Sequence, residues 1–409
     1  MAAFFILVAL VLGIAAGVGI GETGQGTGLV TGAELVGGWW LNGLLMTVIP
    51  LIVSLLITGI GKTSEAARAG KLAGRSVAWF LGWLWFSTIM VALLFPLLLD
   101  SFPLPAEAGA ALQASLGKVA GAGAAPSIVD FMRTLVPSNV VAAAAEDKIL
   151  PLVIFTLAFA FAILTLPDEK RATLIAFFDA VGDAMLAVIG WVLKLAPLGV
   201  FALGIVVGAK SGFAALGALA HYVVLVSTIG ITVLVASYIM ALVAGRVSLG
   251  VYQRAVLPSQ AVAISTQSSL ASLPAMLKGA MSLGVKPETA DLVLPIAVAL
   301  FRATSPGMNL GVAIYIAHWF GMSLSPGQLA AGVAVAAITT IGSVSLPGTI
   351  SFIAAIAPIC VAMGVPFEPL ALLIAVETLP DIFRTVGNVS MDVAVTKAIS
   401  RQTDEGTTA

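Results

Sequence analysis

Apolar stretches of membrane-spanning length alternate with short polar segments along almost the whole chain. The hydrocarbon core of a bilayer requires about 20 consecutive apolar residues per helix. On that criterion the pattern predicts eight full spans, at residues 3–20, 38–60, 74–99, 148–166, 178–208, 216–244, 287–318 and 367–400. Residues 100–147 are rich in alanine, glycine and proline and predict a loop outside the membrane. The expected fold class is an all-α polytopic membrane protein.

Two segments that each contain Ser-Leu-Pro interrupt this apolar sequence. They are Ser268-Ser269-Leu270-Ala271-Ser272-Leu273-Pro274 and Gly342-Ser343-Val344-Ser345-Leu346-Pro347-Gly348, with a third break, Arg302-Ala303-Thr304-Ser305-Pro306-Gly307, between them. Non-helical backbone is tolerated at membrane depth only where protein buries it or where it lines a wet cavity. Broken segments in matching positions of two halves mark the binding sites of transporters, so we expect function to reside between residues 255 and 395.

The composition supports a membrane protein and excludes several other classes. Hydrophobic residues make up 60% of the 409 residues and charged residues only 10%, whereas soluble domains carry about 25% charged residues. A net charge of −1 gives no indication of nucleic-acid binding. One cysteine, Cys360, excludes a disulfide framework, and two histidines, His221 and His318, are too few for a histidine metal centre. No basic segment precedes the first apolar stretch, which therefore predicts a membrane helix rather than a cleaved signal.

Lysine and arginine are concentrated in alternate loops. The basic positions are Lys62, Arg68, Lys71, Arg75, Lys170, Arg171, Arg246, Arg254, Lys397 and Arg401. Because short cytoplasmic loops carry an excess of these residues, both termini are expected on the cytoplasmic side of the membrane. A bacterial inner membrane is the expected location. The two Ser-Leu-Pro segments then form re-entrant hairpins, at about 252–281 and 325–363. The first enters from the cytoplasm and the second from outside, in inverted orientation.

The last span carries an unusual number of polar side chains. They are Glu377, Asp381, Arg384, Thr385, Asn388 and Asp392. At about 100° per residue, the five positions from 381 to 392 fall on one helix face. Ionisable groups within a membrane are costly and usually face a cavity or one another, which favours a functional site. A purely structural ion pair between Asp381 and Arg384 is the alternative.

The residue types on this face fit a particular ligand chemistry. The planar guanidinium of Arg384 binds a carboxylate bidentately, and Asp381 can accept an ammonium group. Asn388, together with the hydroxyl and backbone N–H groups of Ser268 and Ser269, can hold a second carboxylate. This combination predicts a site for aspartate or glutamate. Small residues at either tip taken alone also suit simple close packing, but two matched tips beside a third break favour a binding site.

At these residues the chain resembles the dicarboxylate/amino acid:cation symporters, the family of glutamate and aspartate transporters. The resemblance runs nearly from end to end of the chain. Besides both Ser-Leu-Pro tips, its motifs are Leu150-Pro151, Ala196-Pro197-Leu198-Gly199-Val200-Phe201, Asp381-Ile382-Phe383-Arg384-Thr385-Val386-Gly387-Asn388-Val389 and Asp392.

The resemblance implies a homotrimer with an elevator mechanism and eight helices plus two re-entrant hairpins. Scaffold helices would lie at 1–73 and 148–208, the extracellular loop at 100–147, and the mobile transport domain at 74–99 and 216–400, followed by a cytoplasmic tail at 401–409. Carried over by position, Asp381 would hold the substrate amino group and Arg384 its side-chain carboxylate. The other substrate-binding residues implied are Ser268, Ser269, Ser305, Gly348, Thr385 and Asn388. The second tip would be the extracellular gate.

The chain departs from the family at the third break. The family signature Asn-Met-Asp-Gly-Thr corresponds here to Phe301-Arg302-Ala303-Thr304-Ser305, so the asparagine and aspartate that ligate sodium are absent. Near the same sodium site in the third span we align Phe80, Trp83 and Leu84. Of the sodium-binding side chains, Asp392, Thr340 and Ser343 remain. We therefore expect no cofactor and weak or absent sodium coupling, with a proton bound through Asp392, Asp381 or Glu377 as the substitute.

Arg302 is open to three interpretations. Its guanidinium can replace a bound cation and neutralise Asp392. Alternatively it points into the substrate pocket, in which case the ligand is a dicarboxylate without an amino group. The third interpretation is a long side chain that reaches toward the span end, which its mid-span position disfavours.

The leading function predicted is secondary active transport of an acidic amino acid across the lipid bilayer. A carrier of C4-dicarboxylates or of neutral amino acids is the alternative within the class. An anion channel is the alternative from another class, and conductance without a coupled solute gradient would distinguish it. An enzyme is not expected, because the spans contain no Ser/His pair, catalytic aspartate pair or metal-ligand cluster.

Overall fold

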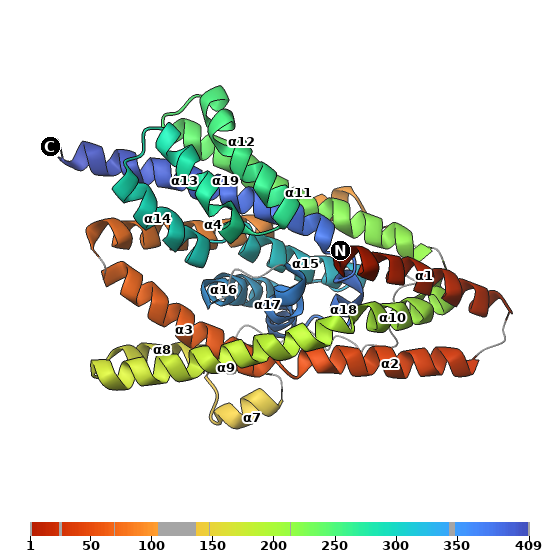
Figure 1. Cartoon of the computed structure of the whole chain (residues 1–409). Helices are drawn as coiled ribbons and strands as arrows, with labels where there is room; N and C mark the ends of the chain where they lie inside the picture. Colours follow the sequence, from red (N-terminus) through yellow and green to blue (C-terminus); the bar gives the residue numbers. More distant parts are fainter. Residues whose placement is uncertain are drawn as a thin grey trace.

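In a computed structural model of the chain, the described residues are 2–23, 27–68, 70–104, 136–146, 148–212, 214–342 and 348–407. They form helices and connecting turns, with no strand among them (Figure 1). The helices are α1 Ala2–Thr23, α2 Thr27–Leu45, α3 Val48–Arg68, α4 Lys71–Ser101, α7 Val140–Ala145, α8 Ile149–Leu164, α9 Asp168–Lys194, α10 Ala196–Ser211, α11 Ala214–Val243, α12 Leu249–Thr266, α13 Ser269–Ser282, α14 Pro287–Leu300, α15 Ser305–Trp319, α16 Pro326–Gly342, α17 Gly348–Met363, α18 Leu370–Leu373 and α19 Thr378–Thr407. The all-helical class predicted from the sequence is confirmed.

Several helices have the length and composition needed to cross a bilayer. Among the described residues these are Lys71–Ser101, Asp168–Lys194, Leu216–Val243 and the stretch Gly28–Glu65, which takes in α2 and α3 together. Shorter apolar helices cover Phe5–Gly21, Pro151–Leu164, Ala196–Lys210, Pro326–Ile341 and Phe352–Met363. Of the loop predicted at 100–147, residues 105–135 lie outside the described residues. The short helix α7 lies in the remaining part of that loop.

Four of the predicted spans are divided in the structure, and those at 287–318 and 367–400 are divided between α14 and α15 and between α18 and α19. The span predicted at 38–60 contains the turn at Met46 and Thr47 between α2 and α3, just ahead of Pro50. The span predicted at 178–208 is divided at Leu195, between α9 and α10, and Pro197 follows in the first turn of α10. Proline lacks the N–H that a helix interior requires, so it is accommodated where a new helix begins.

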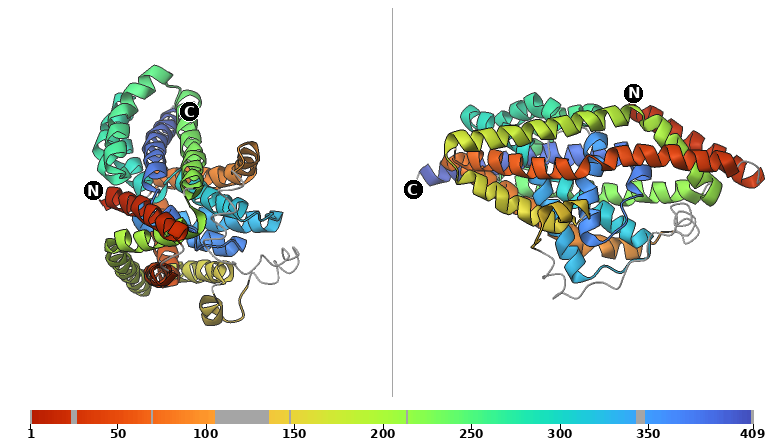
Figure 2. Two further views of the ribbon diagram at one scale, coloured as in Figure 1. Left: turned by 90° about the vertical axis from the view of Figure 1, so that its right-hand side faces the viewer. Right: turned by 90° about the horizontal axis from the view of Figure 1, so that it is seen from below.

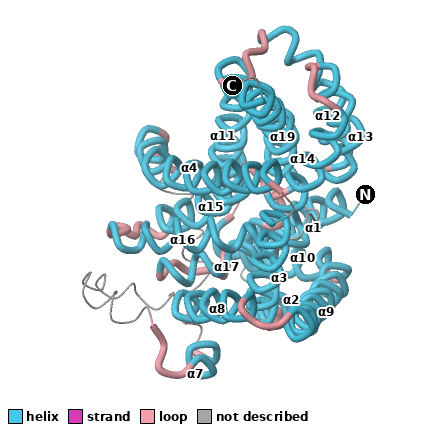
Figure 3. The backbone as a smooth tube through the Cα atoms, turned by 90° about the vertical axis from the view of Figure 1, so that its left-hand side faces the viewer, coloured by secondary structure: helices cyan, strands magenta, loops and turns pink. Residues whose placement is uncertain are grey.

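The helices form a stack in which the hairpin α12–α13 and the long α2, α8 and α9 lie at opposite ends (Figures 1 and 3). Helices α15, α16 and α17 lie between them (Figure 3). Seen from below, α2 and α9 extend along much of the length of the molecule (Figure 2). The largest buried core joins residues of α1, α2, α3, α10, α11 and α15 to α18. A second core joins α11 to α14 with α19.

Helices α1 and α10 pack with their backbones almost in contact. Gly13 and Gly17 of α1 face Phe201 and Ile205 of α10, and a Cβ atom at either glycine would overlap the carbonyl oxygen opposite. Gly208 of α10 meets the carbonyl of Ile14 in the same way. Small residues at such spacing allow close approach between membrane helices, where dispersion contacts rather than hydrophobic exclusion drive association.

Candidate functional site

The polar face of α19 is buried within the protein. Asp381, Arg384, Thr385, Asn388 and Asp392 are each exposed by 4% or less. The sequence placed these five side chains on one face, and the structure buries them. Helix α19 packs mainly against α11, α12, α13 and α14, and Thr304 of the break before α15 contacts Asn388. Glu377, also fully buried, lies in the turn that precedes α19 rather than in the helix itself.

Arg384 is surrounded by acidic groups. Its Nη2 lies 2.7 Å from Oε1 of Glu377, and its Nη1 lies 3.6 Å from Oδ1 of Asp381. The contact with Glu377 is an ion pair at close range rather than a well-aligned hydrogen bond. Tyr222 of α11 donates its hydroxyl to Oε2 of Glu377 at 3.0 Å, so both carboxylate oxygens of Glu377 are engaged. Nε of Arg384 has no hydrogen-bond partner among the described residues.

Asn388 is held by the third break. The backbone N–H of Thr304 donates to Oδ1 of Asn388 at 2.8 Å, and the Thr304 hydroxyl lies 2.9 Å from the same oxygen. That hydroxyl also lies 3.0 Å from the carbonyl oxygen of Arg384. Gly387 permits this approach, because a Cβ atom there would lie 2.5 Å from Cγ2 of Thr304. With its oxygen occupied, Asn388 has its NH₂ group left to donate to a ligand.

We expect Thr304→Val to loosen this arrangement. The change keeps the shape of the side chain but removes the hydroxyl that contacts both Asn388 and Arg384, which contributes about 1 kcal/mol. The midpoint of thermal unfolding in detergent should fall. Thr339→Val is the matched control, since its hydroxyl donates to the Val335 carbonyl of its own helix. An equal fall in both variants would contradict a specific role for Thr304.

Aromatic residues of α4 cover the break before α15. The ring of Phe80 stacks on that of Phe301, with centroids 4.5 Å apart. The indole N–H of Trp83 donates to the carbonyl oxygen of Ala303 at 3.2 Å. These two positions, aligned from the sequence with third-span sodium ligands, thus contact the break before α15 through rings and an indole N–H.

Arg302 lies at the edge of the polar face. Its backbone has a φ of 33°, which is uncommon for a residue with a side chain. Both Asp381 and Arg384 act electrostatically on its guanidinium. Asp381 and Arg384 are among the residues predicted to contact substrate.

The remaining predicted site residues are distributed around this centre. Asp392 is buried, and its Oδ1 has no hydrogen-bond partner among the described residues. The same holds for the hydroxyl of Ser305 at the start of α15. Thr340 is buried in α16 and donates its hydroxyl to the Ala336 carbonyl. Within the described part of the chain, no group of three His, Cys, Asp or Glu side chains could hold a metal ion.

The first tip approaches the start of α19. Gln267 adopts a left-handed conformation, with φ 51°, and its Nε2 donates to the Thr378 carbonyl at 3.2 Å. Ser268 caps α13 by accepting the N–H of Ala271 at 3.2 Å, and Ser269 opens that helix. At the second tip, α17 begins at Gly348, while Ser343 lies outside the described residues.

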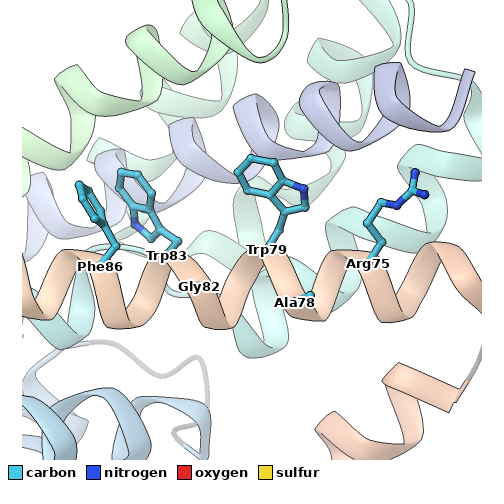
Figure 4. A pocket seen from close by; sticks show the side chains of 6 residues that line it. All are labelled: Arg75, Ala78, Trp79, Gly82, Trp83 and Phe86. Carbon is cyan, nitrogen blue, oxygen red and sulfur yellow. The ribbon is translucent and has the colours of Figure 1, made fainter. Parts of the chain in front are cut away.

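A hollow of about 560 Å³ lies elsewhere, along one side of α4 (Figure 4). Arg75, Ala78, Trp79, Gly82, Trp83 and Phe86 line it. None of these residues belongs to the polar face of α19, so the hollow is a surface groove and not the candidate site.

The sequence did not identify every member of the site. Tyr222 and Thr304 were not assigned a role, and Glu377 was noted among the polar residues without one in substrate binding. Tyr222 looks like a core aromatic in an apolar helix, and its partner lies 155 residues away. For Glu377 a signal was present in the sequence, because a carboxylate within an apolar membrane segment is costly unless it has a partner such as Arg384.

Comparisons with known proteins find transporters that match most of this chain. A proton/glutamate-aspartate symporter of Escherichia coli K12 is 29% identical over 84% of this chain and 79% of its own length. A proton/sodium-glutamate symport protein of Bacillus subtilis is 28% identical over 95% of this chain and 91% of its own. A C4-dicarboxylate transport protein of Rhizobium johnstonii is 28% identical over 89% of this chain and 82% of its own.

The family comparison covers nearly the whole sequence. The pattern that describes the sodium:dicarboxylate symporter family matches residues 3–402, which include every helix that carries the candidate site. The chain therefore belongs to the sodium:dicarboxylate symporter family.

Proposed function

We propose that this protein, a membrane-embedded transporter and not an enzyme, is a symporter for an acidic amino acid such as aspartate or glutamate. One observation carries the proposal: a buried guanidinium, Arg384, lies beside a buried carboxylate, Asp381, and a clamped amide, Asn388. The guanidinium suits a carboxylate and Asp381 suits an ammonium group. Two relatives are named for glutamate or for glutamate and aspartate, which supports the same substrate class.

A C4-dicarboxylate is the second candidate, and Arg302 favours it. A second guanidinium close to Arg384 and Asp381 adds positive charge to the pocket and can pair with Asp381. If Arg302 pairs with Asp381 in place of a substrate ammonium group, the pocket fits a ligand with two carboxylates and no amine. Another relative is named as a C4-dicarboxylate transport protein.

The two candidates are distinguished by a thermal-shift screen of the purified protein. L-Aspartate, L-glutamate, succinate, malate and fumarate would each be added with and without sodium. We expect the largest stabilisation with L-aspartate or L-glutamate. Stabilisation by succinate alone would assign the dicarboxylate function, and no response to any acidic ligand would contradict both candidates.

We further propose that transport depends weakly or not at all on sodium and uses a proton instead. The aromatic cover formed by Phe80, Phe301 and Trp83 supports this, because it leaves few oxygen ligands at the break. Sodium requires several hard oxygens, which apolar rings cannot supply.

Uptake into proteoliposomes tests the coupling. With an inward proton gradient, replacing external sodium by choline should change the initial rate of L-aspartate uptake less than about twofold, because the lost ligands give sodium no binding energy to contribute. Collapse of the pH gradient should abolish accumulation while leaving counterflow. Steep dependence on sodium together with indifference to pH would overturn the proposed coupling.

We also propose the wider architecture that the resemblance to the family implies. A homotrimer would hold a scaffold of residues 1–73 and 148–208 fixed, while residues 74–99 and 216–400 move as an elevator. The helical pairs α12–α13 and α16–α17 would be re-entrant hairpins, and both termini would face the cytoplasm of a bacterial inner membrane. Saturable counterflow without a steady conductance would exclude the anion-channel alternative.

A further inference from the structure

In the structure the carboxylate of Glu377 contacts Arg384. Its Oε1 lies 2.7 Å from Nη2 of Arg384, and the side chain of Glu377 has no exposed surface. A guanidinium binds a carboxylate bidentately through Nη1 with Nη2 or through Nε with Nη2. The two terminal nitrogens of Arg384 already face carboxylates, Nη2 that of Glu377 and Nη1 that of Asp381, so a substrate carboxylate that binds across them competes with Glu377.

Removal of Glu377 from Arg384 would leave a charged carboxylate in a buried position. Such a group is costly unless it is paired, and the usual outcome is that it takes up a proton. The charged and titratable groups around Glu377 are Arg384 and Asp381 of α19 and Tyr222 of α11. Tyr315 of α15 packs against Tyr222, with the two ring centroids 5.3 Å apart. Arg384 is the one cation in this set.

Tyr222 supplies the second half of the arrangement. Its hydroxyl donates to Oε2 of Glu377 at 3.0 Å and thereby supports the charged form of the carboxylate. Tyr222 is itself fully buried, and Tyr315 next to it is fixed by hydrogen bonds to His221 and to the Ala218 carbonyl. A protonated Glu377 can turn from Arg384 and remain bonded to Tyr222, because a hydroxyl can both donate and accept.

We propose that Glu377, supported by Tyr222, is an internal carboxylate that pairs with Arg384 and exchanges with the substrate carboxylate as it gains one proton. The exchange balances: one carboxylate replaces another on Arg384, and the proton from solution binds the displaced Glu377. The inference rests on the proposed function and deepens it, since it assigns the coupled proton to one residue. Glu377 is a positioning residue and does not touch substrate.

Calorimetric titration of the purified protein with L-aspartate tests the exchange. Titrations at pH 5.5 to 8.5, in buffers of different ionisation enthalpy, give the number of protons taken up per ligand. For the unchanged protein we expect about one proton per aspartate, with affinity weakening about tenfold per pH unit at the alkaline end. Glu377→Gln should bind aspartate with no proton uptake and a flat pH profile.

The control variants separate coupling from structure. Glu377→Asp keeps a carboxylate and should keep proton uptake, and Glu288→Gln, which changes an exposed glutamate of α14, should behave as the unchanged protein. Tyr222→Phe removes a hydrogen bond to the charged carboxylate of Glu377, so the pH profile of aspartate affinity should move to higher pH. Because this variant keeps Glu377, it tests the inference even if Glu377→Gln fails to fold.

The outcomes are distinct. Aspartate binding without proton uptake in the unchanged protein overturns the inference and leaves the proposed function standing. Proton uptake that persists in Glu377→Gln also overturns the inference alone, and so does a pH profile that does not move in Tyr222→Phe. Failure of every acidic ligand to bind the unchanged protein overturns the proposed function, and the inference falls with it.

Discussion

Arg384→Ala is expected to abolish the stabilisation of the protein by L-aspartate and to lower the affinity about 30-fold to several-thousand-fold. Truncating one partner of a buried, hydrogen-bonded charge pair costs about 2–5 kcal/mol. Arg384 lies 2.7 Å from Glu377 and 3.6 Å from Asp381, so its loss also leaves two buried carboxylates without this cation. The midpoint of thermal unfolding without ligand should therefore fall too, and isothermal titration gives the affinity directly.

The two effects of Arg384→Ala can be separated. Adding Glu377→Gln to it removes one of the unpaired carboxylates, so the double variant should regain part of the lost stability without regaining affinity. Arg384→Lys retains the charge but not the planar fork and should bind aspartate more weakly than the unchanged protein. Arg401→Ala is the matched control on the same helix, because Arg401 donates to the Ala244 carbonyl away from the polar face. Retained aspartate binding in a folded Arg384→Ala variant would contradict the assignment.

The polar face of α19 could be predicted because helical periodicity alone places Asp381, Arg384 and Asn388 together. What periodicity could not supply was the partner of each group. Asn388 is oriented by Thr304 of the break before α15, 84 residues away, and Arg384 by Glu377 from a turn. A pattern along one helix carries no information about contacts with a distant segment.

The breaks at Leu195 and at Met46 show a different limit. Apolar length predicts a single span across each break, since hydropathy does not distinguish one long helix from two consecutive ones. Pro197 and Pro50 were visible signals of a helix start, and they mark where α10 and α3 begin. The spacing of Gly13, Gly17 and Gly21 likewise indicated a packing face, although not that α10 would be its partner.

Gly17→Leu is expected to have the largest effect on the scaffold, lowering the stability of the fold by about 3 kcal/mol. A Cβ atom at Gly17 would overlap the carbonyl oxygen of Ile205, which is backbone and cannot move aside as a flexible side chain does. Helices α1 and α10 must then separate along their length. That separation removes the contacts of Leu10 and Ile14, which belong to the largest buried core. Thermal unfolding in detergent and the yield of monodisperse protein measure the effect.

Gly19 gives the matched control, because it lies on the same helix with no atom within 4 Å of the Cβ position. Gly19→Leu should leave the midpoint of unfolding unchanged or raise it slightly, since glycine in a helix interior is about 0.5–1 kcal/mol less favourable than alanine. Gly208→Leu should reproduce the loss from the other side of the interface, where its Cβ atom would overlap the carbonyl of Ile14. If Gly17→Leu and Gly19→Leu unfold alike, the close approach of α1 and α10 is not what stabilises this part of the protein. Because neither glycine belongs to the polar face of α19, aspartate affinity in protein that remains folded should be the same in Gly17→Leu as in the unchanged chain.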